Sequence, residues 1–358
     1  MPLIFVSTNS IHPNIHLESM APYTGVELIY GGAPFGFPGG FYDSQDDRIT
    51  KTYEILNAHG VNKIDVAQIY GDSEDSVGRT RAGSKYGLQI DTKWGGGFLP
   101  ILFGVSIPDS PDEVKKMILD AARASVARLA VDQIDVFYVH APPKDVALEV
   151  VLEGINDAHR EGLFRRFGLS NYRAADVQRA HDVARANGWL TPTVYQGSYS
   201  PIARKLEDEL IPVLRKLGIA FYAYSPTSGG FLAKTRAQVE AKEGRFNPQH
   251  VANKFAKAYE KEALLRALDR WWEIAAEEGV SGYELAMRWM AFHSALDKEH
   301  GDGLMLGGQD HVQLQNSFEV LERGPLSDRA VRRMEEVREI AGDEAPTEDY
   351  EKMVKLGS

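Results

Sequence analysis

A short β-rich segment, a loop and an amphipathic helical segment recur along most of the chain, and this alternation constrains the fold more than any other feature. The segment at 110–130, SPDEVKKMILDAARASVARLA, is typical of the helical parts, because its apolar positions recur every three or four residues. Strand-like segments that alternate with such helices are expected to pair in parallel. The eight strand candidates are residues 27–31, 63–67, 88–93, 134–140, 164–170, 191–196, 219–225 and 303–307.

Eight such units, with no Pro-rich or Ser-rich linker between them, predict one α/β domain, a closed (β/α)8 TIM barrel over residues 25–342 that includes C-terminal helices. Residues 1–24 are expected to form an N-terminal extension, and residues 343–358 a C-terminal tail. The alternative fold is an open, doubly wound sheet. That fold usually carries G-x-G-x-x-G after its first strand, and YGGAPFGFPGG at 30–40 does not have this spacing.

Composition limits the classes of partner. The chain has 358 residues, and its 40 basic and 51 acidic side chains give a net charge of -11 without a basic stripe, which disfavours nucleic acid and anionic membrane surfaces. Small molecules are the favoured partners. The absence of cysteine excludes disulfides and thiol catalysis, and the N-terminus lacks the pattern of a signal peptide, so the expected location is cytoplasmic. No apolar run reaches the length of a membrane span.

Four chemistry-bearing side chains end or follow the second, third and fourth predicted strands. Asp65 and Tyr70 lie in DVAQIYGDSE, Lys93 in IDTKWGGGF and His140 in FYVHAPP. The carboxyl ends of barrel strands meet at one mouth, and neighbouring strands lie about 4.8 Å apart, so these side chains are expected to converge. Taken singly, each has an ordinary structural explanation as a cap, a rim aromatic, a surface charge or a hydrogen-bonded histidine. Taken jointly, these explanations require four coincidences.

The four side chains suit the protonation of a developing alkoxide. A free tyrosine has a pKa near ~10, and an adjacent ammonium group stabilises the phenolate and lowers that pKa, which gives Lys93 a role beside Tyr70. Asp65 would keep the lysine charged and oriented, and His140 would hydrogen-bond a substrate carbonyl oxygen. Such a site needs a separate source of hydride.

Together with FGLSNY, TVYQGSYS and FYAYSPTSGGFL, these segments resemble the aldo-keto reductase superfamily, most closely its aflatoxin-aldehyde-reductase-like branch. The resemblance spans roughly Gly25 to Leu326. It implies an NADP(H)-dependent oxidoreductase that reduces aldehydes or ketones to alcohols by hydride transfer, with NADPH as the cofactor and NADH as the alternative. It also implies that Tyr70 is the general acid and that the other three side chains are its partners.

The same resemblance implies a set of residues that hold the cofactor. Glycine in the pyrophosphate segment would leave backbone N–H groups accessible to the phosphates. The implied residues are Ser170, Asn171, Gln196 and Tyr224 for the nicotinamide, and Ser225, Gly229 and Gly230 for the pyrophosphate.

In the family, the segment after the eighth strand usually grips the 2′-phosphate of NADPH with Ser, Lys or Arg side chains. Here MLGGQDHVQLQNS, residues 305–317, contains neither Lys nor Arg, and Gln309, Gln313 and Asn316 offer only neutral hydrogen bonds. Asp310 adds a negative charge. The preference for NADPH over NADH is therefore expected to be weak.

Aromatic residues that follow strand ends predict an apolar substrate pocket over the nicotinamide. They are Phe35, Trp94, Tyr172 and Phe231, and Arg245 in EGRFNP is a candidate partner for a substrate carboxylate. The segment from Gly230 to Glu260 is long and charged, which indicates a lid more than a second domain.

Two other functional classes stay open at this point. A reductase-like barrel also serves as a nucleotide-binding regulatory subunit with little turnover, and the intact set of four side chains argues against a purely structural role. A metal-dependent hydrolase is the third reading. It would need several histidines at strand ends, and His140 is the only one in such a position, so no metal site is expected.

Overall fold

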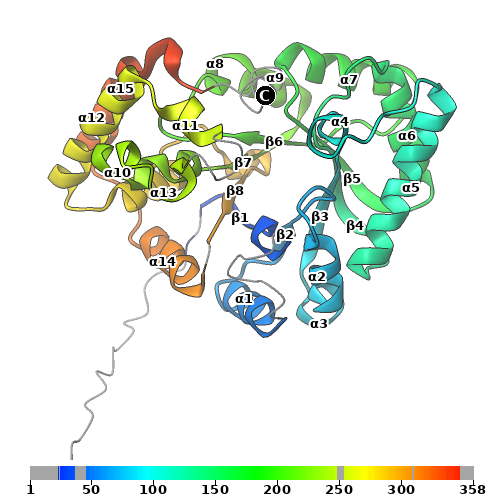
Figure 1. Cartoon of the computed structure of the whole chain (residues 1–358), viewed down its shortest axis with the longest axis horizontal. Helices are drawn as coiled ribbons and strands as arrows, with labels where there is room; N and C mark the ends of the chain where they lie inside the picture. The colour runs from blue at the N-terminus through cyan, green and yellow to red at the C-terminus, as the bar shows by residue number, and fades with distance from the viewer. Residues whose placement is uncertain (1–22, 24, 37–45, 248–253, 309, 347–358) are drawn as a thin grey trace, which may run out of the picture.

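The strands form a closed barrel in the order β1-β2-β3-β4-β5-β6-β7-β8, and every neighbouring pair is parallel. The computed structural model describes residues 23, 25–36, 46–247, 254–308 and 310–346 (Figure 1). This topology confirms the predicted (β/α)8 TIM barrel. Most of the predicted N-terminal extension and the C-terminal tail beyond residue 346 lie outside the described residues.

The eight strands lie within three residues of the predicted bounds at each end, and the larger shifts include the end of β2 and the start of β6. β2 ends at Asp65 rather than at residue 67, and β6 begins at Val194 rather than at residue 191. Pro192 has no N–H group to give to a strand ladder, which favours the later start. The strands are β1 Glu27–Gly31, β2 Lys63–Asp65, β3 Gln89–Trp94, β4 Ile134–Val139, β5 Phe164–Ser170, β6 Val194–Ser198, β7 Ala220–Tyr224 and β8 Gly303–Leu306.

Helices surround the barrel, with α5 and α6 on one side and α12, α13 and α15 on the opposite side (Figure 1). The α-helices are α1 Asp46–Ala58, α2 Ser73–Arg79, α3 Ala82–Tyr86, α4 Phe98–Phe103, α5 Pro111–Leu129, α6 Leu148–Arg160, α7 Ala174–Ala186, α8 Leu206–Glu209, α9 Ile211–Leu217, α10 Arg236–Glu240, α11 Lys254–Tyr259, α12 Glu262–Glu278, α13 Gly282–Phe292, α14 His311–Glu322 and α15 Asp328–Ala341. Within the described ranges, no helix is long and apolar enough to cross a membrane.

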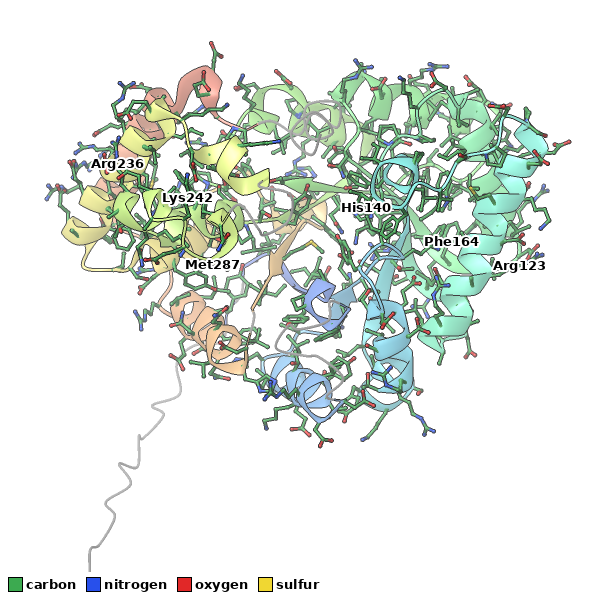
Figure 2. All side chains as sticks on the ribbon, viewed as in Figure 1. Arg123, His140, Phe164, Arg236, Lys242 and Met287 are labelled. Carbon is green, nitrogen blue, oxygen red and sulfur yellow. The ribbon has the colours of Figure 1, made fainter. Side chains whose placement is uncertain are left out.

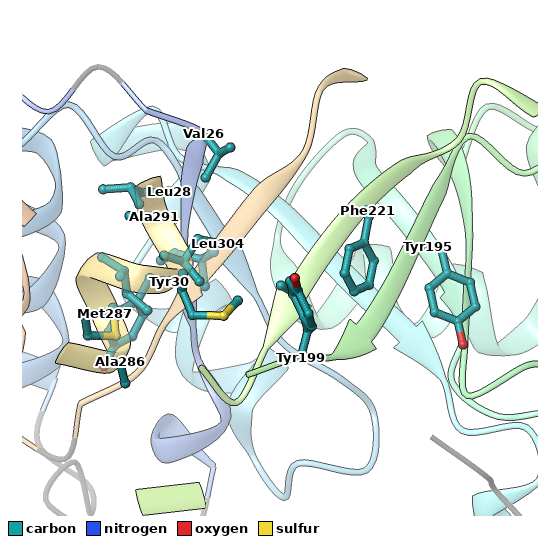
Figure 3. Packing of buried hydrophobic residues seen from close by; sticks show 14 of the residues in the cluster. Val26, Leu28, Tyr30, Tyr195, Tyr199, Phe221, Ala286, Met287, Ala291 and Leu304 are labelled. Carbon is teal, nitrogen blue, oxygen red and sulfur yellow. The ribbon is translucent and has the colours of Figure 1, made fainter. Parts of the chain in front are cut away.

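Alternate side chains of each strand face either the helices or the barrel interior. Figure 3 shows the layer between strands and helices, where Leu28 and Leu304 belong to the same buried cluster as Met287 and Ala291 of α13. A separate, smaller cluster fills the barrel interior and contains Ile29, Val136, Tyr138, Val194, Tyr222 and Met305. The period-2 pattern of the strands therefore separates two apolar layers.

Charged side chains also lie inside the barrel, toward the amino ends of the strands. Lys63 Nζ donates to Glu27 Oε2 at 2.6 Å and to the Tyr222 hydroxyl at 3.1 Å. Arg166 donates to the same hydroxyl at 3.2 Å and pairs with Asp135 at 2.6 Å. Tyr222 thus joins two ion pairs beneath the apolar interior.

The segment between β7 and α12, which the sequence indicated as a lid, contains several short helices. Its first 3-10 helix, Ser228–Ala233, buries Phe231 completely. The Phe231 ring stacks on Tyr259 with centroids 5.0 Å apart and lies 6.0 Å from the Phe246 ring. These three rings anchor both ends of the segment to the core.

Glycine at position 78 allows the close approach of α2 to α5. A Cβ atom at Gly78 would lie 1.9 Å from the carbonyl oxygen of Arg128. Replacement by alanine must therefore separate the two helices, and we expect Gly78→Ala to lower the free energy of unfolding by about 1–3 kcal/mol, as other overpacked sites do. Gly307→Ala is the matched control, because a Cβ atom there meets nothing within 4 Å. Urea unfolding checks this, and an unchanged midpoint for Gly78→Ala would contradict the steric argument.

Candidate active site

A buried ion pair joins the carboxyl ends of β2 and β3. Lys93 Nζ donates to Asp65 Oδ2 at 2.5 Å and to the Val66 carbonyl oxygen at 2.9 Å. From the far side of the barrel, Gln196 Nε2 on β6 donates to Asp65 Oδ1 at 2.9 Å. Both carboxylate oxygens therefore have partners, and the charges of the two side chains balance each other away from water.

Tyr70 reaches this pair from a tight turn after β2. Two glycines allow the turn: a Cβ at Gly36 would lie 1.6 Å from the Tyr70 carbonyl oxygen, and one at Gly71 would lie 2.0 Å from the Gly36 carbonyl oxygen. Gly71 also has a positive φ of 52°. Gly36, which follows β1, therefore admits the backbone of the Tyr70 turn.

The structure brings the four predicted side chains together at one barrel mouth. The Tyr70 hydroxyl lies 3.5 Å from His140 Nε2, at the outer limit of a hydrogen bond, and the two rings meet edge to face at 5.5 Å. Lys93 Nζ lies 5.2 Å from the centre of the Tyr70 ring. Figure 2 shows His140 near the middle of the ribbon, whereas Arg123 and Arg236 project from its periphery.

The electrostatics at Tyr70 differ from the sequence-based expectation. Burial raises the pKa of the Tyr70 phenol above its ordinary value, and the negative charge of Asp65 raises it further. The expected lowering by Lys93 is not found, because the ammonium group is already paired with Asp65 at 2.5 Å. The phenol therefore stays protonated at neutral pH, which is the form that a proton donor requires.

The residues implied for the nicotinamide lie on the other half of the same mouth. Ser170 and Tyr224 end β5 and β7, while Gln196 lies inside β6 and uses its amide nitrogen on Asp65. Asn171 has a positive φ of 62°, and its Nδ2 donates to the His140 carbonyl oxygen at 2.8 Å and to Ser170 Oγ at 3.0 Å. Its Oδ1 is buried without a hydrogen-bond partner among the described residues. That oxygen fits the N–H donor of a carboxamide.

The residues implied for the pyrophosphate form a turn with an unusual backbone. Ser225, Gly229 and Gly230 have φ values of 57°, 67° and 97°. Gly230 N–H donates to the Thr227 carbonyl oxygen at 3.1 Å, and Ser228 N–H donates to the Ser225 carbonyl oxygen at 2.8 Å. These two N–H groups are thus already used within the turn, and an anion-binding role for the segment stays a prediction.

The segment implied for the 2′-phosphate begins α14. The Asp310 carboxylate caps this helix by accepting the Gln313 N–H at 2.7 Å. The residues Gln313 and Asn316 are exposed, while Gln309 lies outside the described residues. His311 Nε2 lies 3.0 Å from the Arg48 carbonyl oxygen, so the first turn of α1 lies against the first turn of α14.

Comparison with known proteins decides which family this architecture represents. The sequence profile described as "Aldo/keto reductase family" matches residues 27–339, which covers the whole barrel. This chain belongs to the aldo/keto reductase family. The predicted superfamily is therefore confirmed, and the chain is an oxidoreductase by family.

Individual relatives of this aldo-keto reductase agree with the predicted branch. The oxidoreductase sirO of Leptosphaeria maculans is 34% identical over 327 residues, which cover 89% of this chain and 95% of that protein. Aflatoxin B1 aldehyde reductase member 2 of Rattus norvegicus is 33% identical over 315 residues, covering 82% and 81%. Aldo-keto reductase family 7 member A3 of Homo sapiens is 32% identical over 308 residues, covering 80% and 87%. These matches support the aflatoxin-aldehyde-reductase-like branch.

The aromatic residues predicted to line a substrate pocket of this aldo-keto reductase are buried. Phe35 packs against the rings of Tyr30 and Tyr53 at 5.5 and 6.0 Å, and Phe231 lies in the aromatic cluster described above. This packing in the core does not support a substrate-lining role for either ring. Trp94 and Tyr172 are also buried, yet Trp94 Nε1 and the Tyr172 hydroxyl have no hydrogen-bond partner among the described residues. The side chain of Arg245 lies outside the described set.

Two residues near the four predicted side chains of this aldo-keto reductase were not predicted. Phe98, at the start of α4, packs edge to face on His140 with ring centres 5.0 Å apart. Asp91 lies two residues before Lys93, on the same face of β3, and pairs in register with Asp65. Strand period 2 applied backward from Lys93 would have placed Asp91 inside the barrel. Within the described ranges, no group of three His, Cys, Asp or Glu side chains could hold a metal ion.

The Asp91 side chain is completely buried, and only one of its two carboxyl oxygens has a hydrogen-bond partner among the described residues. Its Oδ1 accepts the Val136 N–H at 3.1 Å, while its Oδ2 has no hydrogen-bond partner among the described residues. Burial raises the pKa of Asp91 to about 8, and the negative charges of Asp65 and Asp135 contribute in the same direction. At neutral pH this environment therefore favours the protonated form of the carboxyl group.

The raised pKa of Asp91 makes its contribution to stability depend on pH. The folded protein holds this proton more tightly than the unfolded chain, so the contribution is fully present below about pH 4 and is lost as the pH rises toward about 8. Asn cannot titrate, so we expect the stability of Asp91→Asn relative to wild type to increase between about pH 5 and about pH 8. Urea unfolding at several pH values measures this difference, with Asp132→Asn at an exposed position as the control. A difference independent of pH would show that Asp91 is ionised throughout.

Proposed function

We propose that this aldo-keto reductase reduces aldehydes or ketones to alcohols with NADP(H), and that Tyr70 is the general acid. The observation that carries this proposal is the placement of the Tyr70 hydroxyl 3.5 Å from His140 Nε2 and beside the buried Lys93–Asp65 pair. A carbonyl oxygen placed between the phenol and the imidazole would meet two hydrogen-bonding groups. When bound, NADPH supplies the hydride that the carbonyl carbon accepts.

Each side chain of the set has a distinct task in this proposal. The Tyr70 phenol, which its surroundings keep protonated, gives its proton to the substrate oxygen as negative charge develops there. Lys93 Nζ lies 5.2 Å from the centre of the Tyr70 ring, and its ion pair with Asp65 offsets the carboxylate charge that disfavours a phenolate there. Asp65 holds that ammonium group in place and also accepts a hydrogen bond from Gln196. His140 orients the carbonyl oxygen of the substrate.

The cofactor part of the proposal rests on Asn171 and its neighbours. Asn171 Oδ1 is a buried acceptor that has no partner in the described part of the chain, and the carboxamide of a nicotinamide has two N–H donors to offer it. Tyr224 ends β7 at the same mouth and is partly exposed, a position that suits a ring stacked on the nicotinamide. The cytoplasmic location expected from the composition stays a prediction alongside this proposal.

Removal of the Tyr70 hydroxyl tests the assignment of the general acid. Tyr70→Phe keeps the ring and its packing but has no proton to donate, so we expect turnover to fall by about 10²-fold or more with NADPH binding retained. A panel of aldehydes and ketones, followed by the absorbance of NADPH, first identifies a substrate for the wild-type protein. Quenching of protein fluorescence by NADPH then compares the dissociation constants of the two proteins.

The same measurements separate the enzyme from the alternative of a regulatory subunit. A regulatory barrel would bind NADPH and leave every carbonyl compound in the panel unreduced. A Tyr70→Phe protein with near wild-type kcat on a good substrate would remove Tyr70 from the mechanism. Tyr86→Phe, on the α3 helix, is the matched control for loss of a tyrosine hydroxyl elsewhere.

The dinucleotide preference follows from the charge of the α14 segment. Residues 305–317 contain no Lys or Arg, and the Asp310 carboxylate occupies the N-terminal turn of the helix. A phosphate dianion gains most from guanidinium or ammonium donors. We therefore expect NADPH to bind less than about 100-fold more tightly than NADH, a difference below about 2.7 kcal/mol.

Fluorescence quenching by each dinucleotide measures the two dissociation constants. An advantage of NADPH beyond about 100-fold would show that a cation from another element reaches the phosphate. Arg48 is the first residue to test in that case, because its backbone contacts His311 at the start of α14. Loss of the advantage in Arg48→Ala, with NADH binding unchanged, would assign the contact.

A further inference from the structure

The segment after β3 carries an unusual exposed apolar surface. Four of the five large hydrophobic side chains that are exposed among the described residues lie between positions 101 and 105. Leu102 and Phe103, on the α4 helix, are 58% and 54% exposed, and Ile101 and Val105 flank them. Exposed apolar groups that cluster in this way, rather than occurring singly, mark a binding surface.

The base of α4 is attached to both sides of the catalytic mouth. The Phe98 ring packs edge to face on His140, with ring centres 5.0 Å apart. On the other side, a Cβ atom at Gly95 would lie 2.7 Å from the Leu99 side chain and 3.0 Å from that of Ile69, the residue before Tyr70. Gly97 N–H also donates to the Ala141 carbonyl oxygen at 3.0 Å, directly after His140. Residues 95–99 therefore connect α4 to the loops that carry Tyr70 and His140.

Helix geometry relates the exposed side chains to these attachment points. Residues four positions apart lie on the same face of a helix, so Leu102 continues the face of Phe98, and Phe103 continues the face of Leu99. Two apolar rows thus begin beside His140 and Ile69 and lead outward to solvent. In Figure 1, α4 lies nearer the centre of the ribbon than the longer helices α5 and α6.

We propose that α4 is a binding surface for the apolar tail of the substrate, and that this enzyme prefers aldehydes or ketones with an extended hydrocarbon chain. The inference rests on the proposed reduction at Tyr70 and His140. The carbonyl group lies between these two side chains, and the chain leaves the mouth along the rows from Phe98 to Leu102 and from Leu99 to Phe103. The exposed rows begin beside His140, where the carbonyl group is proposed to bind. This favours a substrate over a partner protein as the ligand of α4, because a substrate contacts His140 and the exposed rows at the same time.

A series of straight-chain aldehydes from propanal to decanal tests the proposal. Each methylene group that moves from water onto an apolar surface is expected to raise kcat/KM by about 2- to 4-fold, until the chain extends past α4. The double variant Leu102→Gln and Phe103→Gln keeps a good helix-forming side chain at each position but replaces the apolar surface with amides. For this double variant, the ratio of kcat/KM with a long aldehyde to kcat/KM with propanal is expected to be much smaller than the same ratio for the wild type.

Val312→Gln is the matched control. Val312 is 78% exposed on α14, and its replacement removes an apolar group of similar exposure from a different element. The control is expected to keep the chain-length dependence of the wild type. Circular dichroism and urea unfolding of all three proteins establish that the variants are folded.

The outcomes separate this inference from the function on which it rests. If the wild-type protein reduces no aldehyde or ketone, the proposed function and the inference both fail. If it reduces propanal and decanal with equal kcat/KM, or if the double variant keeps the wild-type rise, the inference alone is overturned. Light scattering measures the oligomeric state of both proteins. If the wild type is a dimer and the double variant is a monomer that keeps the wild-type chain-length dependence, α4 is a contact between two copies of the chain. That result would overturn the substrate assignment.

Discussion

The buried ion pair between Lys93 and Asp65 organises the barrel mouth. Removal of two charges from water costs several kcal/mol per ion, and the pair is tolerated because hydrogen bonds from Gln196 and to the Val66 carbonyl oxygen satisfy the remaining groups. Loss of one partner would leave a buried charge uncompensated, a change that typically costs about 3–5 kcal/mol. Side chains from β2, β3 and β6 thus meet in one hydrogen-bonded group, and the Tyr70 ring lies beside it.

Charge balance inside the barrel explains why Asp91 behaves differently from its neighbours. Toward the amino ends of the strands, Glu27 with Lys63 and Asp135 with Arg166 form compensated pairs. Among the described residues, Asp91 forms no ion pair and its Oδ2 has no hydrogen-bond partner, although Arg166 and Lys63 lower its pKa. In a low-dielectric interior, the least costly state of such a carboxyl group is the neutral one. Protonation therefore takes the place of a partner.

Much of the fold and part of the candidate site could be predicted from the sequence. The alternation of segments gave all eight strands to within a few residues, and parallel strand ends explain why Asp65, Lys93 and His140 meet. The environment of each group could not be read in the same way. The pKa of Tyr70 depends on the burial of its phenol and on the pairing of Lys93 with Asp65, and Phe35 packs into the core through Tyr30 and Tyr53.

The sequence by itself determined where the strands lie along the chain and which side chains share a face of each strand, because the strand period is a local property. Only the tertiary structure decided how buried or exposed those and other side chains are. The run FLPILF is as apolar as a core segment, yet the fold leaves Leu102 and Phe103 exposed beside the mouth. Burial is the sum of contacts from elements distant in the chain, and in this protein those contacts set the pKa of Tyr70, the protonation of Asp91 and the surface of α4.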